Sequence, residues 1–228
     1  MLLLRVTIGD EPGEPALALR RAAVAADALR RLAELRGTRT ALALDAPGDG
    51  LVPTLADLNV LPAGDLPAAP HRAADVEVVA GRPPAGGGEE QQPRRRLVMG
   101  AVDAPGALDL AALDDPLALR LALLAEPAPE PVRLTEAGLA GVAGRLRRWR
   151  AVVATAAESP SAPVAGPYVD RVIAALADGL DGPAVLAALD ALVADRSLRP
   201  GAVFETLALL DRVLALDLVR DVGRAPGS

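Results

Sequence analysis

The sequence contains no cysteine and no lysine, and these two absences exclude more chemistry than any motif that is present. Without cysteine the chain cannot form a disulfide, a thiolate nucleophile or a cysteine-ligated zinc site. All 24 basic residues are arginine, and the only histidine is His71. Catalysis by a lysine or by a pair of histidines is therefore excluded for this chain alone.

Aromatic residues are almost as scarce, with one Trp, one Tyr and one Phe among 228 residues. The 51% hydrophobic content consists almost entirely of Ala, Leu and Val, as a GC-rich bacterial coding sequence tends to produce. Because Leu and Val recur at helical spacing, this composition predicts a folded chain rather than a disordered one.

The charge and hydropathy of the chain exclude further classes of protein. The net charge is −6 and the pI is near 4.9, so we do not expect nucleic acid binding, which needs a basic surface. No uncharged apolar run approaches the length of about 18 residues that a membrane span requires. The first apolar residues reach Arg5 too soon for a signal peptide, so we expect a cytoplasmic protein.

The first quarter of the chain alternates between strand and helix patterns. Residues 1–8 form a short apolar run typical of a buried strand, and residues 16–36 carry Leu, Val and Ala on one helical face. Gly37 is placed to end that helix, and residues 40–44 predict a second strand. Strand, helix and strand in this order predict a βαβ unit with parallel strands.

The rest of the chain divides into a short mixed part and a helical part. Residues 81–96 include the stretch GRPPAGGGEEQQP, which we interpret as an exposed, mobile loop, and residues 97–102 predict a strand. Apolar residues at helical spacing then predict five helices, at 115–126, 135–158, 166–179, 182–195 and 200–222. The pattern therefore indicates an α/β half followed by an all-helical half.

Several segments, in order along the chain, resemble cysteinyl-tRNA synthetase and its relative, the mycothiol-pathway cysteine ligase. They are residues 27–37, residues 57–62 with the following Pro67 and His71, residues 115–124, residues 176–184, and residues 210–216. The segment 57–62, DLNVLP, is similar to the one that precedes the inserted domain of that family. The segment 176–184, LADGLDGPA, is similar to a turn of its helical domain.

The resemblance implies a reduced class I aminoacyl-tRNA synthetase. Residues 1–125 would form a degenerate Rossmann-like core with a parallel sheet and a mobile loop at 81–96, and the inserted domain of the family would be missing around residues 73–96. Residues 126–228 would form an all-α bundle like the C-terminal helical domain of the synthetases.

The residues of the parent chemistry are absent. Where the family carries its H-I-G-H signature, this chain reads GDEPGEPALAL, with Asp10, Glu11 and Glu14 where a triphosphate would lie. Where the family carries K-M-S-K-S, only Met99 corresponds. Positioned cations are needed to stabilise charge on phosphates, so we expect no synthetase activity. Zinc ligands are also missing, so we expect no metal site.

A turn between a strand and a helix is the usual place for a nucleotide phosphate, so a residual pocket is conceivable after the first strand. The turn lacks the G-x-G-x-x-G pattern, so we expect no cofactor. ATP is the one ligand that a residual pocket there would suit. The candidate pocket residues are Ile8, Gly9, Asp10, Gly13 and Asp45.

Other residues each have a functional and a plainer interpretation. Trp149, with the arginines of residues 145–150 around it, would suit a base-stacking RNA patch, but a solvated helix face with Trp149 partly in the core is favoured. The arginines of residues 94–96 suit a phosphate or an acidic partner, and a charged loop end is the plainer alternative. His71 is interpreted as a surface loop residue, and Asp178 and Asp181 as helix caps.

Three functions remain open from the sequence. The first is a catalytically inactive synthetase paralogue, a pseudoenzyme that acts as a binding or regulatory partner of another protein. The second is a residual adenylate-binding protein or a repurposed ligase-type enzyme. The third is a tRNA-binding module, which the net charge disfavours. The sequence leaves the partner and the oligomeric state open.

Overall fold

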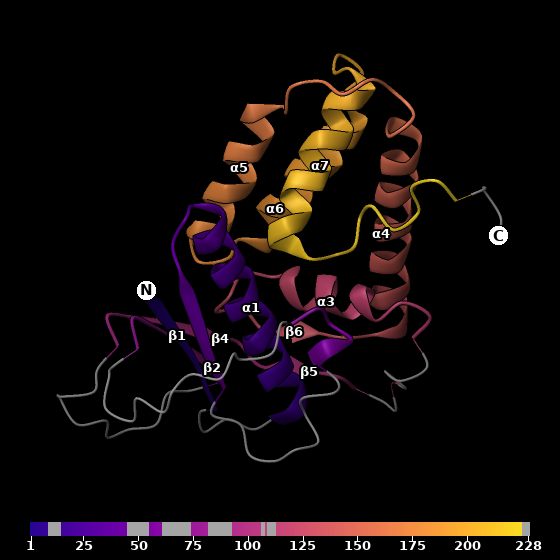
Figure 1. Ribbon diagram of the computed structural model, residues 1–228. Coiled ribbons are helices and arrows are strands. Elements are labelled where there is room, and N and C mark those ends of the chain that lie inside the picture. The colour runs from indigo at the N-terminus through magenta and orange to yellow at the C-terminus, as the bar shows by residue number, and fades with distance from the viewer. Residues whose placement is uncertain are drawn as a thin grey trace.

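The computed structural model describes residues 1–8, 15–44, 55–60, 74–81, 93–105, 108 and 113–224. Its strands are β1 (Leu2–Ile8), β2 (Thr40–Leu44), β3 (Val76–Ala80), β4 (Arg95–Met99), β5 (Val102–Asp103) and β6 (Val132–Arg133). Its helices are α1 (Pro15–Leu35), α3 (Pro116–Leu124), α4 (Glu136–Ala156), α5 (Gly166–Ala177), α6 (Gly182–Ala194) and α7 (Pro200–Leu214). The strands gather at one end of the molecule and α4 to α7 at the other (Figure 1).

The first four strands form a single parallel sheet in the order β2-β1-β3-β4. Leu4 in β1 lies opposite Leu42 in β2 and Val76 in β3, so β1 is an inner strand. Strands β5 and β6 pair separately, also in parallel. The predicted parallel βαβ unit over the first 44 residues is therefore confirmed.

Helix α1 covers one face of this sheet. It packs on β1, β2 and β3, and its fully buried Ala22, Ala25 and Ala26 belong to the same cluster as Leu4 and Val6. Such small side chains allow a helix to approach a sheet closely. The predicted stop is confirmed as well: α1 ends at Leu35, two residues before Gly37 with its positive φ of 76°.

The helices of the second half begin where the sequence predicts. The Thr135 hydroxyl accepts a hydrogen bond from the Gly138 N–H at 3.1 Å, and the Asp181 carboxylate accepts one from the Ala184 N–H at 3.0 Å. Pro183 occupies the first turn of α6. These caps satisfy N–H groups that have no partner inside the helix.

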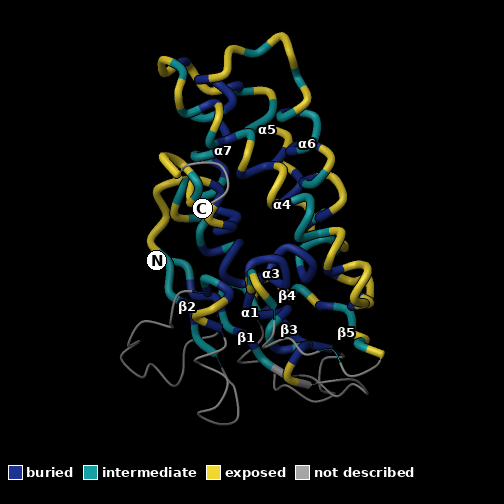
Figure 2. Tube along the Cα trace, turned by 90° about the vertical axis from the view of Figure 1, so that its right-hand side faces the viewer, coloured by how far each residue is buried: buried dark blue, intermediate teal, exposed yellow. Residues whose placement is uncertain are grey.

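One buried cluster runs through both halves of the chain, from Leu4 to Leu218. Figure 2 shows the buried positions gathered around α1 and α3. The described residues thus form a mixed α/β structure with a four-stranded parallel sheet and six helices. The division at residue 125 stays a prediction. Among the described helices, none combines the length and the apolarity that crossing a membrane requires.

Two predicted boundaries are wrong. The single strand expected over 97–102 is two strands, because the chain leaves the sheet at Gly100, whose N–H donates to the Ala128 carbonyl at 2.7 Å. The mobile loop expected over 81–96 ends earlier, since Arg95 and Arg96 form the start of β4.

The predicted last helix, 200–222, is also too long, because α7 ends at Leu214. Ala215 adopts a positive φ of 54°, and the chain then turns back on the helix. The Asp211 carboxylate holds the turn by accepting hydrogen bonds from the N–H groups of Leu216 and Leu218, both at 2.8 Å. Apolar spacing continues past this turn, which is why periodicity alone extended the helix.

A buried ionic cluster joins α1 to the rest of the core. It consists of Asp27, Arg30, Arg31 and Arg120, and we call it the Asp27 cluster. The Asp27 carboxylate, which is completely buried, lies 2.7 Å from Arg30, 2.8 Å from Arg31 and 2.9 Å from Arg120. Burial alone would raise the pKa of Asp27, but the three arginines hold it below its ordinary value of 3.8.

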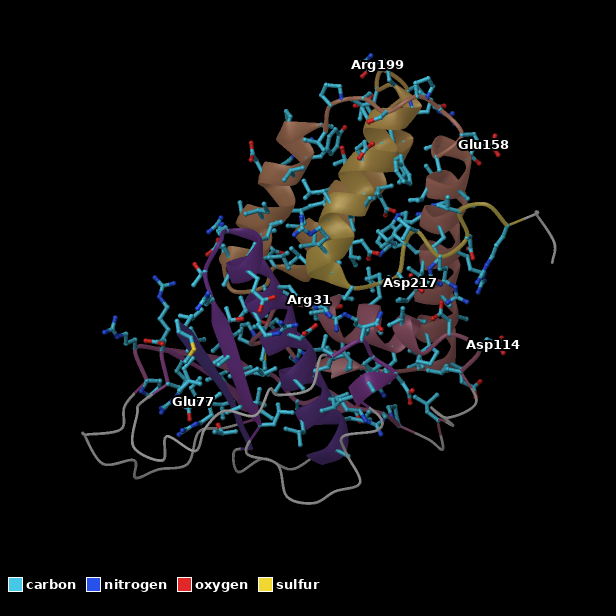
Figure 3. All side chains as sticks on the ribbon, in the orientation of Figure 1. Arg31, Glu77, Asp114, Glu158, Arg199 and Asp217 are labelled. Atoms are coloured by element: carbon cyan, nitrogen blue, oxygen red, sulfur yellow. The ribbon has the colours of Figure 1, made fainter. Side chains whose placement is uncertain are left out.

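The arginines of the Asp27 cluster extend to two further segments. Arg120 donates to the carbonyl of Leu214 at the end of α7 and to that of Leu58, at 2.7 and 2.8 Å. Arg31 donates to the carbonyl of Asn59 at 2.9 Å. Figure 3 labels Arg31 on α1, at the level where the helical end begins. The cluster therefore fixes α1, α3, residues 55–60 and the end of α7 relative to one another.

We expect Asp27→Asn to lower the free energy of unfolding by about 3–5 kcal/mol, because it leaves a buried arginine without its counter-ion. The measurement is urea denaturation followed by circular dichroism. The control is Glu34→Gln, which removes the half-exposed partner of Arg30 and should change stability by no more than about 0.5 kcal/mol. Equal effects of the two substitutions would contradict a buried role for Asp27.

The same carboxylate predicts a pH dependence. Because the folded pKa of Asp27 lies below the unfolded one, its stabilising contribution is complete above about pH 4 and is lost as the pH falls through the folded value. The free energies of unfolding of the wild type and of Asp27→Asn should therefore converge as the pH falls from about 4 towards 2. A constant difference between them across that range would argue against this linkage.

Two glycines at helical positions predict opposite responses to alanine. Gly141 lies in the middle of α4, where an added Cβ meets nothing within 4 Å, so Gly141→Ala should stabilise the protein by about 0.5–1 kcal/mol. Gly182 opens α6, and an added Cβ there collides with the Leu124 carbonyl. Gly182→Ala should therefore lower the melting temperature, while Gly141→Ala raises it.

Candidate functional site

The carboxyl edge of the sheet is the place where this topology would form a ligand site. Helix α1 leads from β1 to β2 on one side, whereas β3 pairs with β1 on the other side. Ile8 at the end of β1 lies beside Ala80 at the end of β3. Ligands of open parallel sheets bind outside the carboxyl ends of such neighbouring strands, where the connections diverge.

The structure places one of the candidate pocket residues and leaves the others open. Ile8 is the last residue of β1. Leu44, the last residue of β2, pairs with Val6 of β1, so both strands end at the same edge of the sheet. The remaining candidates, Gly9, Asp10, Gly13 and Asp45, lie outside the described residues, as does His71.

Arg21, on the second turn of α1 near this edge, is completely buried. The Arg21 guanidinium donates to the carbonyls of Gly100 and Glu130 at 2.7 and 2.6 Å, and to that of Pro127 at 2.9 Å. Longer hydrogen bonds, of 3.4 Å, reach the carbonyls of Leu123 and Glu126. Arg21 therefore binds the end of β4 to the segment that follows α3.

The charge of Arg21 remains in place at neutral pH. Burial lowers its pKa to about 10, and the nearby Glu126 acts in the opposite direction. All five N–H donors of a guanidinium can be engaged by carbonyl oxygens in this way. Since the donors of Arg21 already point to backbone carbonyls, this cation has no donor left for a phosphate.

The arginine-rich stretch of α4 is a structural surface, as the plainer interpretation predicted. Trp149 is completely buried, and its indole N–H donates to the Asp190 carboxylate at 2.9 Å. Arg145 and Arg148 form ion pairs with the same carboxylate at 3.4 and 2.8 Å. A buried indole cannot stack on a nucleic acid base, so this stretch has no aromatic platform.

Arg150, at the end of the same stretch, faces inward. Its guanidinium is bonded to the Asp115 carboxylate and donates to the carbonyls of Leu216 and Asp217 at 2.6 and 3.0 Å. It thus holds the turn after α7 against the start of α3. The predicted capping role is confirmed for Asp181, whose carboxylate caps α6, whereas Asp178 ends α5 with only its backbone N–H bonded to the Ala174 carbonyl.

Two hollows among the described residues are respectively small and shallow. A cavity of about 10 Å³, enough for one water molecule, lies between α3, α5, α6 and α7 among leucine and valine side chains such as Leu121 and Leu189. A wide, shallow hollow lies at the opposite edge of the sheet, beside Met1, Glu34 and Arg39. In the described part of the chain, no three acidic or histidine side chains are arranged to hold a metal ion.

Sequence reasoning assigned no role to the buried charges, although a signal was present. Arg120 interrupts the apolar run PLALRLALL of α3, and Arg21 and Asp27 lie on the face of α1 that packs against the core. A charge inside an apolar stripe has to be paired when it is buried. Pairing partners, however, come from segments far along the chain, and no local pattern identifies them.

Comparison with known proteins does not assign the chain to a family. No protein-family model matches the sequence, and no curated protein is similar to it. The function has to be argued from the residues and their geometry.

We expect Arg21→Met to lower the free energy of unfolding by at least about 3 kcal/mol, because several buried carbonyls lose their donor. Arg21→Lys should restore little of this loss, since an ammonium group cannot reach carbonyls on all sides of a planar guanidinium. Arg36→Met, at an exposed position just after α1, is the control and should be nearly neutral. Full rescue by lysine would show that only the charge of Arg21 is needed.

Proposed function

We propose that this chain is a shortened, catalytically inactive relative of cysteinyl-tRNA synthetases that acts as a binding or regulatory partner of another protein. The proposal includes a reduced Rossmann-like core over residues 1–125 and a helical bundle over residues 126–228. The parallel pairing of β1 with both β2 and β3 supports the first part. The run of helices from α4 to α7 supports the second.

The observation that carries the proposal is the charge of the segment that joins β1 to α1. Between the end of β1 and the start of α1 the sequence reads GDEPGE, with three acids and no cation. Amino acid activation requires positive groups that stabilise the negative charge developing on the phosphates of ATP. Acids at this position would instead repel a triphosphate.

The buried arginines do not replace the missing cations. Arg21 is surrounded by backbone carbonyls, and Arg120 is bonded to Asp27 and to two carbonyls. Burial lowers the pKa of Arg120, and Asp27 opposes that shift. These guanidinium groups stabilise the packing of the core. The chain also has no lysine or cysteine that could perform the roles those residues have in an active synthetase.

The test of inactivity is an ATP–pyrophosphate exchange assay with cysteine as the amino acid. We expect no cysteine-dependent exchange above a protein-free blank, because the segment between β1 and α1 carries three acids and no cation that could stabilise the transferred charge. An active cysteinyl-tRNA synthetase in the same assay is the positive control. Cysteine-dependent exchange that copurifies with this chain through a second purification would overturn the proposal.

Binding measurements separate the proposal from its alternatives. Calorimetric titration with ATP, cysteine and a non-hydrolysable cysteinyl-adenylate analogue should give no saturable heat. Saturable binding without turnover would support an adenylate-binding protein instead. A gel shift with tRNA that weakens as the salt concentration rises would support the tRNA-binding alternative.

A further inference from the structure

The outer edge of β4 exposes backbone groups that can pair with another strand. Strand β4 is the last strand of the sheet among the described residues. The Arg95 N–H donates to the Asp75 carbonyl at 3.1 Å, and the Met99 carbonyl accepts from the Gly81 N–H at 3.2 Å, so these residues face β3. Successive residues of a strand direct their backbone groups to opposite sides. Arg96 and Val98 therefore direct their N–H and C=O groups away from the sheet.

The side chains along this edge are exposed and mainly basic. Leu97 and Met99 pack on the α1 side of the sheet, which places Arg96 and Val98 on the opposite face. Arg95 and Arg96 are exposed, and the Val98 residue is 36% exposed. Figure 3 labels Glu77, the neighbour of Arg96 in the sheet, at the end of the molecule away from Arg199.

Acidic neighbours balance only part of this charge. Arg96 forms an ion pair with Glu77 at 2.7 Å, and Arg94, with a side chain that is 86% exposed, lies 3.7 Å from Asp75. Arg95 forms no ion pair with any residue that the structure describes. The edge is thus a local concentration of positive charge on a chain with a net charge of −6.

We propose that the edge of β4 binds an extended acidic segment of a partner protein as an added strand. This inference rests on the proposed function as a binding partner and names the chemistry of that partner. Main-chain hydrogen bonds to Arg96 and Val98 supply the affinity, and carboxylates beside Arg95 and Arg96 supply the specificity. A second copy of this chain would bring further arginines to the edge in place of the complementary acids.

The test is fluorescence anisotropy of the full chain with a labelled peptide of about seven residues that contains two adjacent glutamates followed by threonine and valine. We expect saturable binding that weakens as the salt concentration rises, because the charges are exposed. A peptide with glutamine in place of both glutamates should bind about tenfold more weakly, the loss expected for two exposed charge pairs. Equal binding of the two peptides would overturn the acidic specificity.

Two variants test the backbone and the charge separately. Val98→Pro removes one of the two outward N–H groups and leaves the bonds to β3 in place, as a proline on an edge strand can. It should abolish peptide binding, whereas Val98→Thr should retain it. Arg95→Glu should weaken binding at least about tenfold, and Arg36→Glu, the same charge change at a remote exposed site, should not.

Circular dichroism of each variant verifies that it folds. If Val98→Pro does not fold, the wild type is titrated with two peptides, N-methylated at the odd-numbered or at the even-numbered residues. The peptide whose methyl groups block the N–H groups that face β4 should fail to bind. If the acidic peptide does not bind, the proposal is overturned. The arginines would then be charged edge residues that disfavour pairing of β4 with strands of other chains. Sedimentation that shows a dimer of the wild type, lost in Val98→Pro, would also overturn it, in favour of self-association. Neither result bears on the pyrophosphate exchange assay, which tests the proposed function by itself.

Discussion

The contact between Asp27 and Arg120 is the interaction on which the arrangement of the whole molecule depends. Both side chains are completely buried and lie 2.9 Å apart. Through them α1, which covers the sheet, is fixed to α3, and the remaining donors of Arg120 fix α3 to Leu214 and Leu58. A buried ion pair contributes little net stability compared with an apolar pair, but separating its two charges is strongly destabilising because each is then left buried without a partner. It therefore determines the position of the helical end of the molecule relative to the sheet.

Guanidinium groups perform the same task at two other junctions. Arg21 joins α1 and β4 to the segment after α3, and Arg150 joins the start of α3 to the turn after α7. In each case most partners are backbone carbonyls of segments outside the helix that carries the arginine. A planar group with five donors can satisfy several such carbonyls at once, which the ammonium group of a lysine cannot. A chain whose basic residues are all arginine is suited to this kind of junction.

The elements that local chemistry determines could be predicted from the sequence. Apolar spacing located α1 and the start of α4, and Gly37 correctly predicted where α1 ends. The end of α7 could not be predicted, because it depends on Asp211 and on Arg150 from another helix. The candidate pocket was predicted as a turn after β1, but of its residues only Ile8 is described, so its geometry stays a prediction. The buried arginines were missed because their partners are distant in sequence.

The scarcity of aromatic residues connects the core of this protein to its proposed function. The largest completely buried side chains are Trp149, Arg21 and Arg120, so two arginines fill volume that aromatic residues would fill in a more usual core. Each one needs carbonyl or carboxylate partners, because an unpaired buried charge is too costly. All five donors of Arg21 are engaged and Arg120 is completely buried, so neither cation is available to a ligand at the surface. Positive charge that remains available has to lie at the surface, as it does along β4, where it suits an acidic partner better than a phosphate transfer that needs enclosed, positioned donors.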